Sequence, residues 1–226
     1  VTWQEILPKS ALAGGSHNYF PILSRERWTH LRLNIFPDGG VARLRVHGRV
    51  RPSAKGLAGI IDVAAAASGG LVVTANDMYF GPKDNLIFPG KALHMGEGWE
   101  TRRKRGPGHD WIILKLAGKS LIQKIEVDTD HFKGNFPDRC SVDALNSDKD
   151  LLPCDFRDDF RDGFNENLKW REILAPTKLQ AHHSHVFEKE LTHQKNEAFS
   201  YLRLNIYPDG GVSRLRVWGT LKCQHS

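Results

Sequence analysis

An 18-residue segment occurs twice in this chain and restricts its fold more than any other feature. Residues 31–48 read LRLNIFPDGGVARLRVHG, and residues 202–219 read LRLNIYPDGGVSRLRVWG. The copies are 171 positions apart and identical at 15 of 18 positions. Such a long spacing is typical of a duplicated domain and not of a short-period solenoid. The chain is therefore predicted to contain parts of two related units.

The similarity continues upstream of the duplicated segment, because Trp3 and Leu7 match Trp170 and Leu174. Residues 1–48 resemble only residues 168–219, so the first copy is the end of a repeat. We predict that residues 1–50 are the C-terminal portion of a first repeat, 51–70 a linker and 71–220 a complete second repeat. An isolated pair of strands buries little apolar surface. The first copy is thus expected to need a partner surface, a neighbouring chain or further residues.

Within each copy, the pattern predicts a β-hairpin. Leu202, Leu204 and Ile206 alternate with polar residues, as in a half-buried strand. Residues 208–211 (PDGG) supply turn chemistry between the two strands. The polar face of the paired strands would carry Arg203, Asn205, Arg214 and Arg216. This face is either a solvated outer surface or an anion site, since arginine offers a planar fork of donors to a carboxylate.

The rest of the chain reads as many short strands with little helical periodicity. Strands are expected at 71–75, 111–116, 121–127 and 141–144, with a turn at 118–120 and a short helix over 59–67. The acidic stretch 146–167 is interpreted as a solvated loop, because it lacks the ligand spacing and glycine of a calcium loop. The pattern favours an all-β sandwich.

Composition excludes several classes of protein. The net charge is +6, yet acidic residues are interspersed and the only dense basic run is residues 102–105, so a nucleic-acid partner is not expected. No apolar run is long enough to span a bilayer. Three widely spaced cysteines suggest a reducing compartment. Without a visible signal peptide or C-terminal peroxisomal tripeptide, we expect an intracellular location, cytoplasmic or peroxisomal.

Four stretches together resemble the allantoicase family: residues 98–105 (GWETRRKR), 107–111 (PGHDW), 127–129 (VDT) and the NxxPDGGxxRLRxxG segment. The resemblance covers nearly the whole chain. It implies a tandem of jelly-roll-like (galactose-binding-like) β-sandwiches. It also implies a hydrolase that converts allantoate and water to ureidoglycolate and urea in purine (allantoin) degradation, and a homo-oligomer.

Candidate site residues follow from the chemistry of that substrate. A carboxylate requires arginine, and cleavage of a carbon–nitrogen bond requires a base for water and an acid for the departing urea. The catalytic candidates are Glu100, His109 and Asp110. The substrate-binding candidates are Arg102, Arg103, Arg203, Asn205, Arg214 and Arg216. Glu100, Arg102, His109 and one arginine face are expected to converge in one pocket.

Structural interpretations of the same residues stay open. His109 and Asp110 fit a turn cap, Glu100 fits a bridge to Arg102 or Arg103, and Asp128 fits a turn at the end of a strand. The tryptophans Trp99 and Trp111 fit a core. No cofactor is assigned. Nitrogen and oxygen ligands for a divalent metal are available at residues 100, 109, 110, 128, 130 and 131 and in the cluster 182–185, but none has diagnostic spacing.

Two alternatives to an allantoicase-like hydrolase remain. A β-sandwich can bind a small ligand without any reaction, because fold does not fix function. The partial first repeat also fits a vestigial chain that keeps the fold without the activity.

Overall fold

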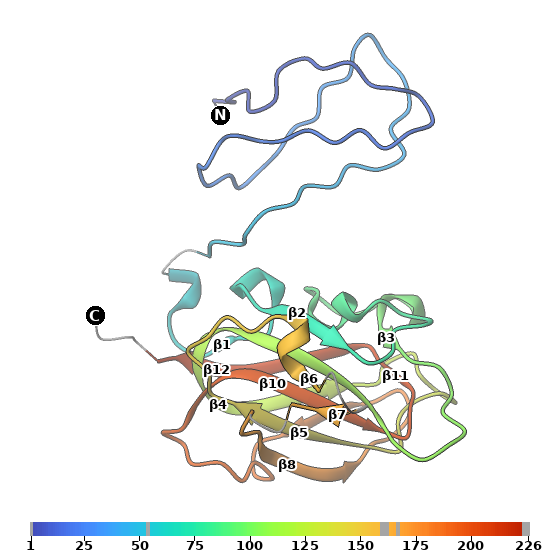
Figure 1. Cartoon of the computed structure of the whole chain (residues 1–226), viewed down its shortest axis with the longest axis vertical. Coiled ribbons are helices and arrows are strands. Elements are labelled where there is room, and N and C mark those ends of the chain that lie inside the picture. The colour runs from blue at the N-terminus through green and yellow to red at the C-terminus, as the bar shows by residue number, and fades with distance from the viewer. Residues whose placement is uncertain (1, 53–54, 159–162, 166–167, 223–226) are drawn as a thin grey trace. The chain divides into compact units, whose positions relative to one another are not determined.

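The computed structural model describes residues 2–52, 55–158, 163–165 and 168–222 (Figure 1). The chain separates into two compact units, Val1–His47 and Gly48–Ser226, and each is described by itself. Cys223 and the C-terminal tripeptide lie outside the described residues, as do Asp159 and Asp162 of the acidic stretch.

The second unit is built from antiparallel strands and short 3-10 turns, as the prediction of an all-β fold requires. Its strands are β1 (Ile61–Asp62), β2 (Leu71–Ala75), β3 (Trp99–Glu100), β4 (Asp110–Asp128), β5 (Arg139–Leu145), β6 (Arg157–Asp158), β7 (Gly163–Phe164), β8 (Arg171–Lys178), β9 (Ser184–Phe187), β10 (Ala198–Tyr207), β11 (Gly211–Val212) and β12 (Arg214–Leu221). Its 3-10 turns are η1 (Lys55–Leu57), η2 (Ala66–Ser68), η3 (Lys83–Ile87), η4 (Met95–Glu97) and η5 (Pro153–Phe156).

The 19-residue strand β4 connects the two layers of this unit. Its first part lies between β2 and β10, and β10 continues to β5 and β8. Its last part lies between β9 and β12, and β12 pairs with β1. The predicted turn at residues 118–120 is wrong: Ser120 pairs with Phe199 on one edge and Leu221 on the other. Because β4 is hydrogen-bonded along both of its edges at Ser120, the strand continues through Gly118 without turning.

The predicted hairpin is also wrong in its pairing, although both of its strands and its turn exist. β10 and β12 each pair with β4 and are not neighbours in the sheet order β1-β12-β4-β10-β5-β8. The turn follows the prediction, since Gly210 has a φ of 139°, a conformation that glycine adopts without steric cost. The strand β4, which is distant in sequence, therefore lies between β10 and β12, although the short connection between these two strands predicted that they would be neighbours.

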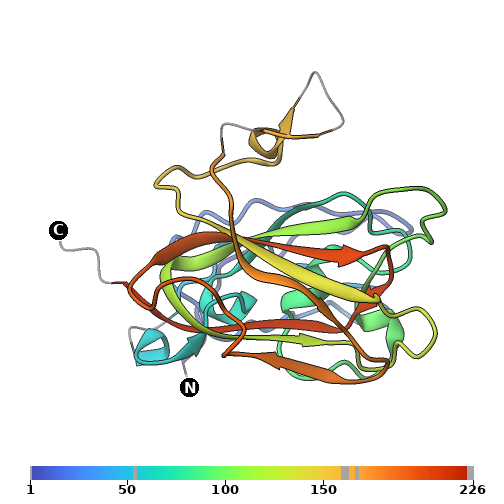
Figure 2. The same ribbon diagram turned by 90° about the horizontal axis from the view of Figure 1, so that it is seen from below.

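Two apolar clusters fill the unit. The main core contains Ile112, Leu114, Leu204 and Val217, all fully buried, together with the predicted core residue Trp99. A second cluster covers the outer face of β4 and β10, with Ile113, Leu145, Leu151, Phe156 and Tyr201. Figure 2 shows η5 and the β6–β7 pair (yellow to orange) standing out from this side of the strands. The predicted acidic loop is thus partly ordered secondary structure.

The segment 59–67 does not form the predicted helix. Ile61 and Asp62 form β1, while Val63 and Ala64 enter the core. The carboxylate of Asp62 accepts hydrogen bonds from the amides of Ala64 (3.1 Å) and Val217 (3.0 Å). The bond from Val217 attaches this segment to β12, and that pairing outweighs the high helix propensity of the alanines.

The first unit contains no strand among its described residues 2–47. Arg32 lies over the ring of Trp3 at 4.6 Å, as Arg203 lies over Trp170 at 5.0 Å in the second unit. In the described part of the chain, no helix has the length and apolar character that crossing a membrane requires.

Candidate active site

The turn at residues 208–211 is enclosed by the GWET segment. Strand β3 pairs with β11, so Glu100 lies opposite Gly211. The hydroxyl of Thr101 accepts a hydrogen bond from the amide of Gly210 (3.1 Å), and the Asp209 carboxylate accepts one from the Lys104 amide (2.7 Å). A Cβ atom on Gly211 would lie 1.9 Å from the Phe132 ring. Two motifs far apart in sequence thus form one structural region.

His109 and Asp110 point away from each other, because successive side chains of an extended chain alternate in direction. His109 packs its ring against Tyr207, with 4.8 Å between ring centroids. Burial lowers the pKa of His109 from its ordinary value of 6.5, an effect partly opposed by Asn205. The imidazole is therefore neutral at pH 7 and able to accept a proton.

The carboxylate of Asp110 is buried at the start of β4, with 1% of the residue exposed. One oxygen lies 2.8 Å from the ammonium of Lys104 and accepts a hydrogen bond from the Asn76 amide, also at 2.8 Å. The second oxygen has no hydrogen-bond partner among the described residues. Asp110 holds Lys104 in place and keeps one unused acceptor.

Arg203 and Asn205 share the carboxylate of Asp143. The Arg203 guanidinium donates two hydrogen bonds to Asp143, at 2.8 and 2.9 Å, and the Asn205 amide donates one at 2.7 Å. Asn205 also donates to Ser141, whose hydroxyl bonds that of Tyr207. The alternative of a solvated face is wrong here, because Asn205 is only 3% exposed.

Arg214 and Arg216 hold the segment between η3 and η4. Arg214 donates to the carbonyls of Gly90 (3.1 Å) and Glu97 (2.7 Å). Arg216 donates to the carbonyls of Phe88 (2.7 Å) and Gly90 (2.8 Å). Arg214 is 5% exposed, so a solvated face is wrong for this residue too. These two guanidinium groups are engaged with backbone oxygens.

Glu100 and Arg102 do not form the bridge that the sequence left open. The Glu100 carboxylate accepts a hydrogen bond from the Asn135 amide. Arg102 pairs with Asp77 at 3.3 Å and lies 4.6 Å from the Tyr79 ring centroid. Arg102 and its neighbour Arg103 are exposed, so they are the two candidate arginines that face solvent.

Some of the predicted site residues contact one another or share partners, and others have partners of their own. His109, Arg203 and Asn205 lie together, and so do Arg214 and Arg216. Glu100, Arg102 and Asp110 have other partners. Sequence reasoning missed Asp143 and Lys104, which hold these groups. A lone acid in the apolar run 142–145 was the available signal for Asp143.

Other predicted groups are also located. Asp128, the last residue of β4, accepts a hydrogen bond from the Asp130 amide (2.8 Å), which confirms the turn at the end of a strand. Burial raises the pKa of the Cys140 thiol to about 12, so this thiol is a protonated core side chain. One group of potential metal ligands lies within the described residues: Asp130, His131 and His182.

Comparisons with known proteins agree with this architecture. A family model described as "Allantoicase repeat" matches residues 1–51 and 61–222. A probable allantoicase of Burkholderia mallei is 45% identical over 225 residues, covering 97% of this chain and 63% of the relative. The allantoicase of Dictyostelium discoideum is 44% identical over 217 residues, covering 95% of this chain and 56% of the relative.

A solved structure shows the same fold. The crystal structure of Saccharomyces cerevisiae allantoicase is 35% identical, with a TM-score of 0.60 over 76% of this chain and 45% of that chain. The chain spans less than two thirds of the length of the curated relatives named above.

Proposed function

Because this chain belongs to the allantoicase family, we propose that it serves the hydrolysis of allantoate to ureidoglycolate and urea. In this reaction one carbon–nitrogen bond of the substrate breaks and a carbon–oxygen bond to water forms. Water must lose a proton, and the departing urea must gain one. The observation that carries the proposal is family membership over nearly the whole chain.

We propose His109 as the base that takes the proton from water. Its lowered pKa leaves the ring nitrogen unprotonated near neutral pH, as a general base requires. The ring is half-buried and not enclosed. Glu100 is half-buried and pairs with Gly211 at the turn formed by residues 208–211. We propose it as the acid that protonates the departing ureido group.

We assign the substrate carboxylate to Arg102 and Arg103. The other three candidate arginines are engaged: Arg203 with Asp143, and Arg214 and Arg216 with backbone carbonyls. Moving Arg203 would leave the buried Asp143 carboxylate without its charged partner, which costs about 1–3 kcal/mol. Arg102 is 66% exposed, and its bond to Asp77 is an exchangeable surface contact.

The experiment is an assay of urea release from allantoate by the full chain and by Glu100→Gln. The matched control is Glu126→Gln, another half-buried glutamate that accepts a hydrogen bond, here from Ser184 (2.8 Å). We expect a loss of about a hundredfold or more for Glu100→Gln and an unchanged rate for the control. Equal rates for both variants would remove Glu100 from catalysis.

Calorimetry with allantoate separates the hydrolase from the alternative of a non-catalytic binding module. Binding together with urea release supports the hydrolase, whereas binding without product supports the module. Arg103→Ala should weaken binding, and its exposed neighbour Arg105→Ala is the control. We also propose that the protein is a homo-oligomer, which light scattering of the purified chain would test.

A further inference from the structure

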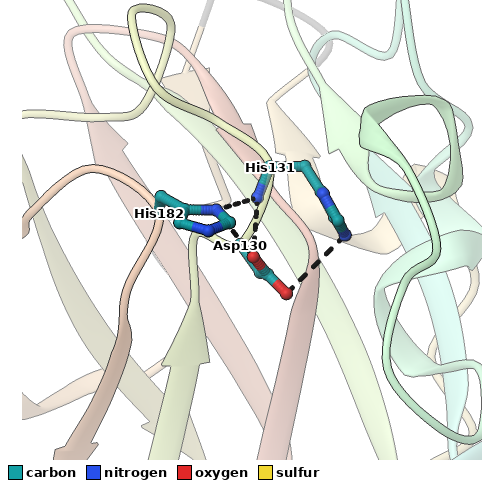
Figure 3. A group of neighbouring side chains, drawn as sticks. All are labelled: Asp130, His131 and His182. Carbon is teal, nitrogen blue, oxygen red and sulfur yellow. Dashed lines mark hydrogen bonds and ion pairs between the residues drawn. The ribbon is translucent and has the colours of Figure 1, made fainter.

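A cluster of three side chains lies outside the residues given roles above. Asp130 and His131 follow the end of β4, and His182 lies in the loop between β8 and β9. Figure 3 shows the two imidazole rings on either side of the Asp130 carboxylate. We propose that Asp130, His131 and His182 form a binding site for a divalent transition-metal ion such as Zn²⁺.

The spacing of the donor atoms is close to what such an ion needs. The Nδ1 atom of His182 lies 2.7 Å from Oδ1 of Asp130, and Nε2 of His131 lies 3.6 Å from Oδ2. All three ligand atoms lie within 4.8 Å of one another. Ligands of a tetrahedral zinc ion, bonded at about 2.0–2.2 Å, are separated by about 3.3–3.6 Å. Side-chain rotations therefore suffice to surround an ion.

The donor set matches the chemistry of borderline divalent ions. Two imidazoles and one carboxylate supply three protein ligands and leave a coordination position for water. Three of the existing contacts must be exchanged on binding. The Nδ1 atom of His182 must give up the hydrogen bond that it accepts from the His131 amide (2.9 Å) and its direct contact with Asp130 Oδ1 (2.7 Å). The Nε2 atom of His131 must leave the Ala92 carbonyl, which is 2.9 Å away.

The backbone already fixes the two loops against each other. The Thr129 amide and hydroxyl bond the carbonyl of His183, both at 3.0 Å, and the hydroxyl also bonds that of Gln180 at 2.6 Å. The His182 amide bonds the Phe132 carbonyl at 3.0 Å. The ligands are therefore positioned before any ion arrives, which lowers the entropic cost of binding.

Both histidines have an unusual backbone conformation. His131 has a φ of 69° and His182 a φ of 51°, and they are the two non-glycine residues with positive φ in the described part of the chain. Residues other than glycine keep this strained conformation only where the surrounding structure holds it, and such residues cluster at functional sites. The side chains are also reachable, with 27%, 28% and 49% of the surface of Asp130, His131 and His182 exposed.

The test is a titration of the full chain with Co²⁺ after treatment with EDTA, followed by visible absorption. We expect one tightly bound Co²⁺ per chain and its displacement by Zn²⁺. The variants His131→Asn and His182→Asn should each weaken binding by about tenfold or more. Asparagine is chosen because it tolerates positive φ, so the backbone of each loop is preserved.

The matched control is His183→Ala, which removes an exposed histidine adjacent to the cluster in sequence. Its affinity for Co²⁺ should equal that of the unaltered chain. Circular dichroism of each metal-free variant must show an unchanged β spectrum. If the unaltered chain and both asparagine variants bind Co²⁺ equally, or none binds, the cluster is only a hydrogen-bonded network and the proposal is overturned. This readout needs no allantoate, so it stands apart from the proposed function.

Discussion

The two copies of the duplicated segment have nearly the same sequence and different structures. In the second copy, Leu204 and Val217 are fully buried in the strands β10 and β12. In the first copy, the equivalent residues Leu33 and Val46 are 49% and 59% exposed. Residues 31–48, all of which the structure describes, contain no strand. The same sequence thus forms strands only in the copy where other strands pair with it.

The difference lies in strands outside the duplicated segment. β10 is bonded on both edges, to β4 and to β5, and β12 is bonded to β4 and to β1. Within residues 1–48, no sequence corresponds to these partner strands. The comparison teaches that the alternating pattern specifies which face is apolar, while non-local pairing decides whether a strand forms.

Hydrogen exchange should show the largest contrast between the copies. The backbone of Leu202, Leu204 and Ile206 lies in the middle of the sheet, so we expect these amides to exchange about a thousandfold or more slower than those of Leu31, Leu33 and Ile35. Amide exchange followed by NMR measures both sets in one sample. Similar rates in the two copies would show that the first copy has a sheet partner.

The second contrast is the cost of a truncated core side chain. Leu204→Ala should reduce the free energy of unfolding of the second unit by about 2–5 kcal/mol, because it leaves a cavity in the core. The equivalent change Leu33→Ala should alter this transition by less than about 0.5 kcal/mol. Urea denaturation measures both values. A matching loss for Leu33→Ala would contradict the separation into two units.

A pair of glycines sharpens the comparison further. Gly211→Ala would place a Cβ atom 1.9 Å from the Phe132 ring, while nothing lies within 4 Å of the equivalent Cβ on Gly40. Overpacking of this kind costs about 1–3 kcal/mol, so only Gly211→Ala should lower the denaturation midpoint. An unaffected midpoint would mean that Phe132 moves aside freely.

The smallest expected effect is the dependence of the free energy of unfolding on pH. The pKa of His109 is lowered in the folded state from 6.5. Its contribution to stability is fully present above 6.5 and is lost as the pH falls below 6.5, because the unfolded chain takes up the proton first. The free energy of unfolding should therefore fall less steeply toward acid pH in His109→Gln than in the unaltered chain. The ring packs on Tyr207, whose counterpart Phe36 is 63% exposed.

Sequence reasoning predicted the strands β2, β10 and β12 and the turn at 208–211, because side-chain alternation and turn residues are local signals. It divided β4 at a turn that does not exist and assigned the segment of β1 to a helix. It placed β10 and β12 side by side because their connection is short. Nothing local announces that β4 comes between them. Contacts between distant strands were also missing from the predicted site. Arg203 was treated as free to bind a ligand, but Asp143 on β5 forms an ion pair with it. The grouping of Asp130 and His131 with His182 likewise depends on contacts between distant loops.

The long strand β4 has a consequence for how this protein folds during its synthesis. Residues 110–128 are made early, but the strands that flank them include residues 198–207 and 214–221. During synthesis, the apolar side chains of β4 therefore stay exposed to solvent until the residues of β10 and β12 have left the ribosome. Folds dominated by such distant pairings form slowly and expose their unfinished edges to aggregation. Chaperone protection during synthesis would matter most while this strand awaits its last neighbours.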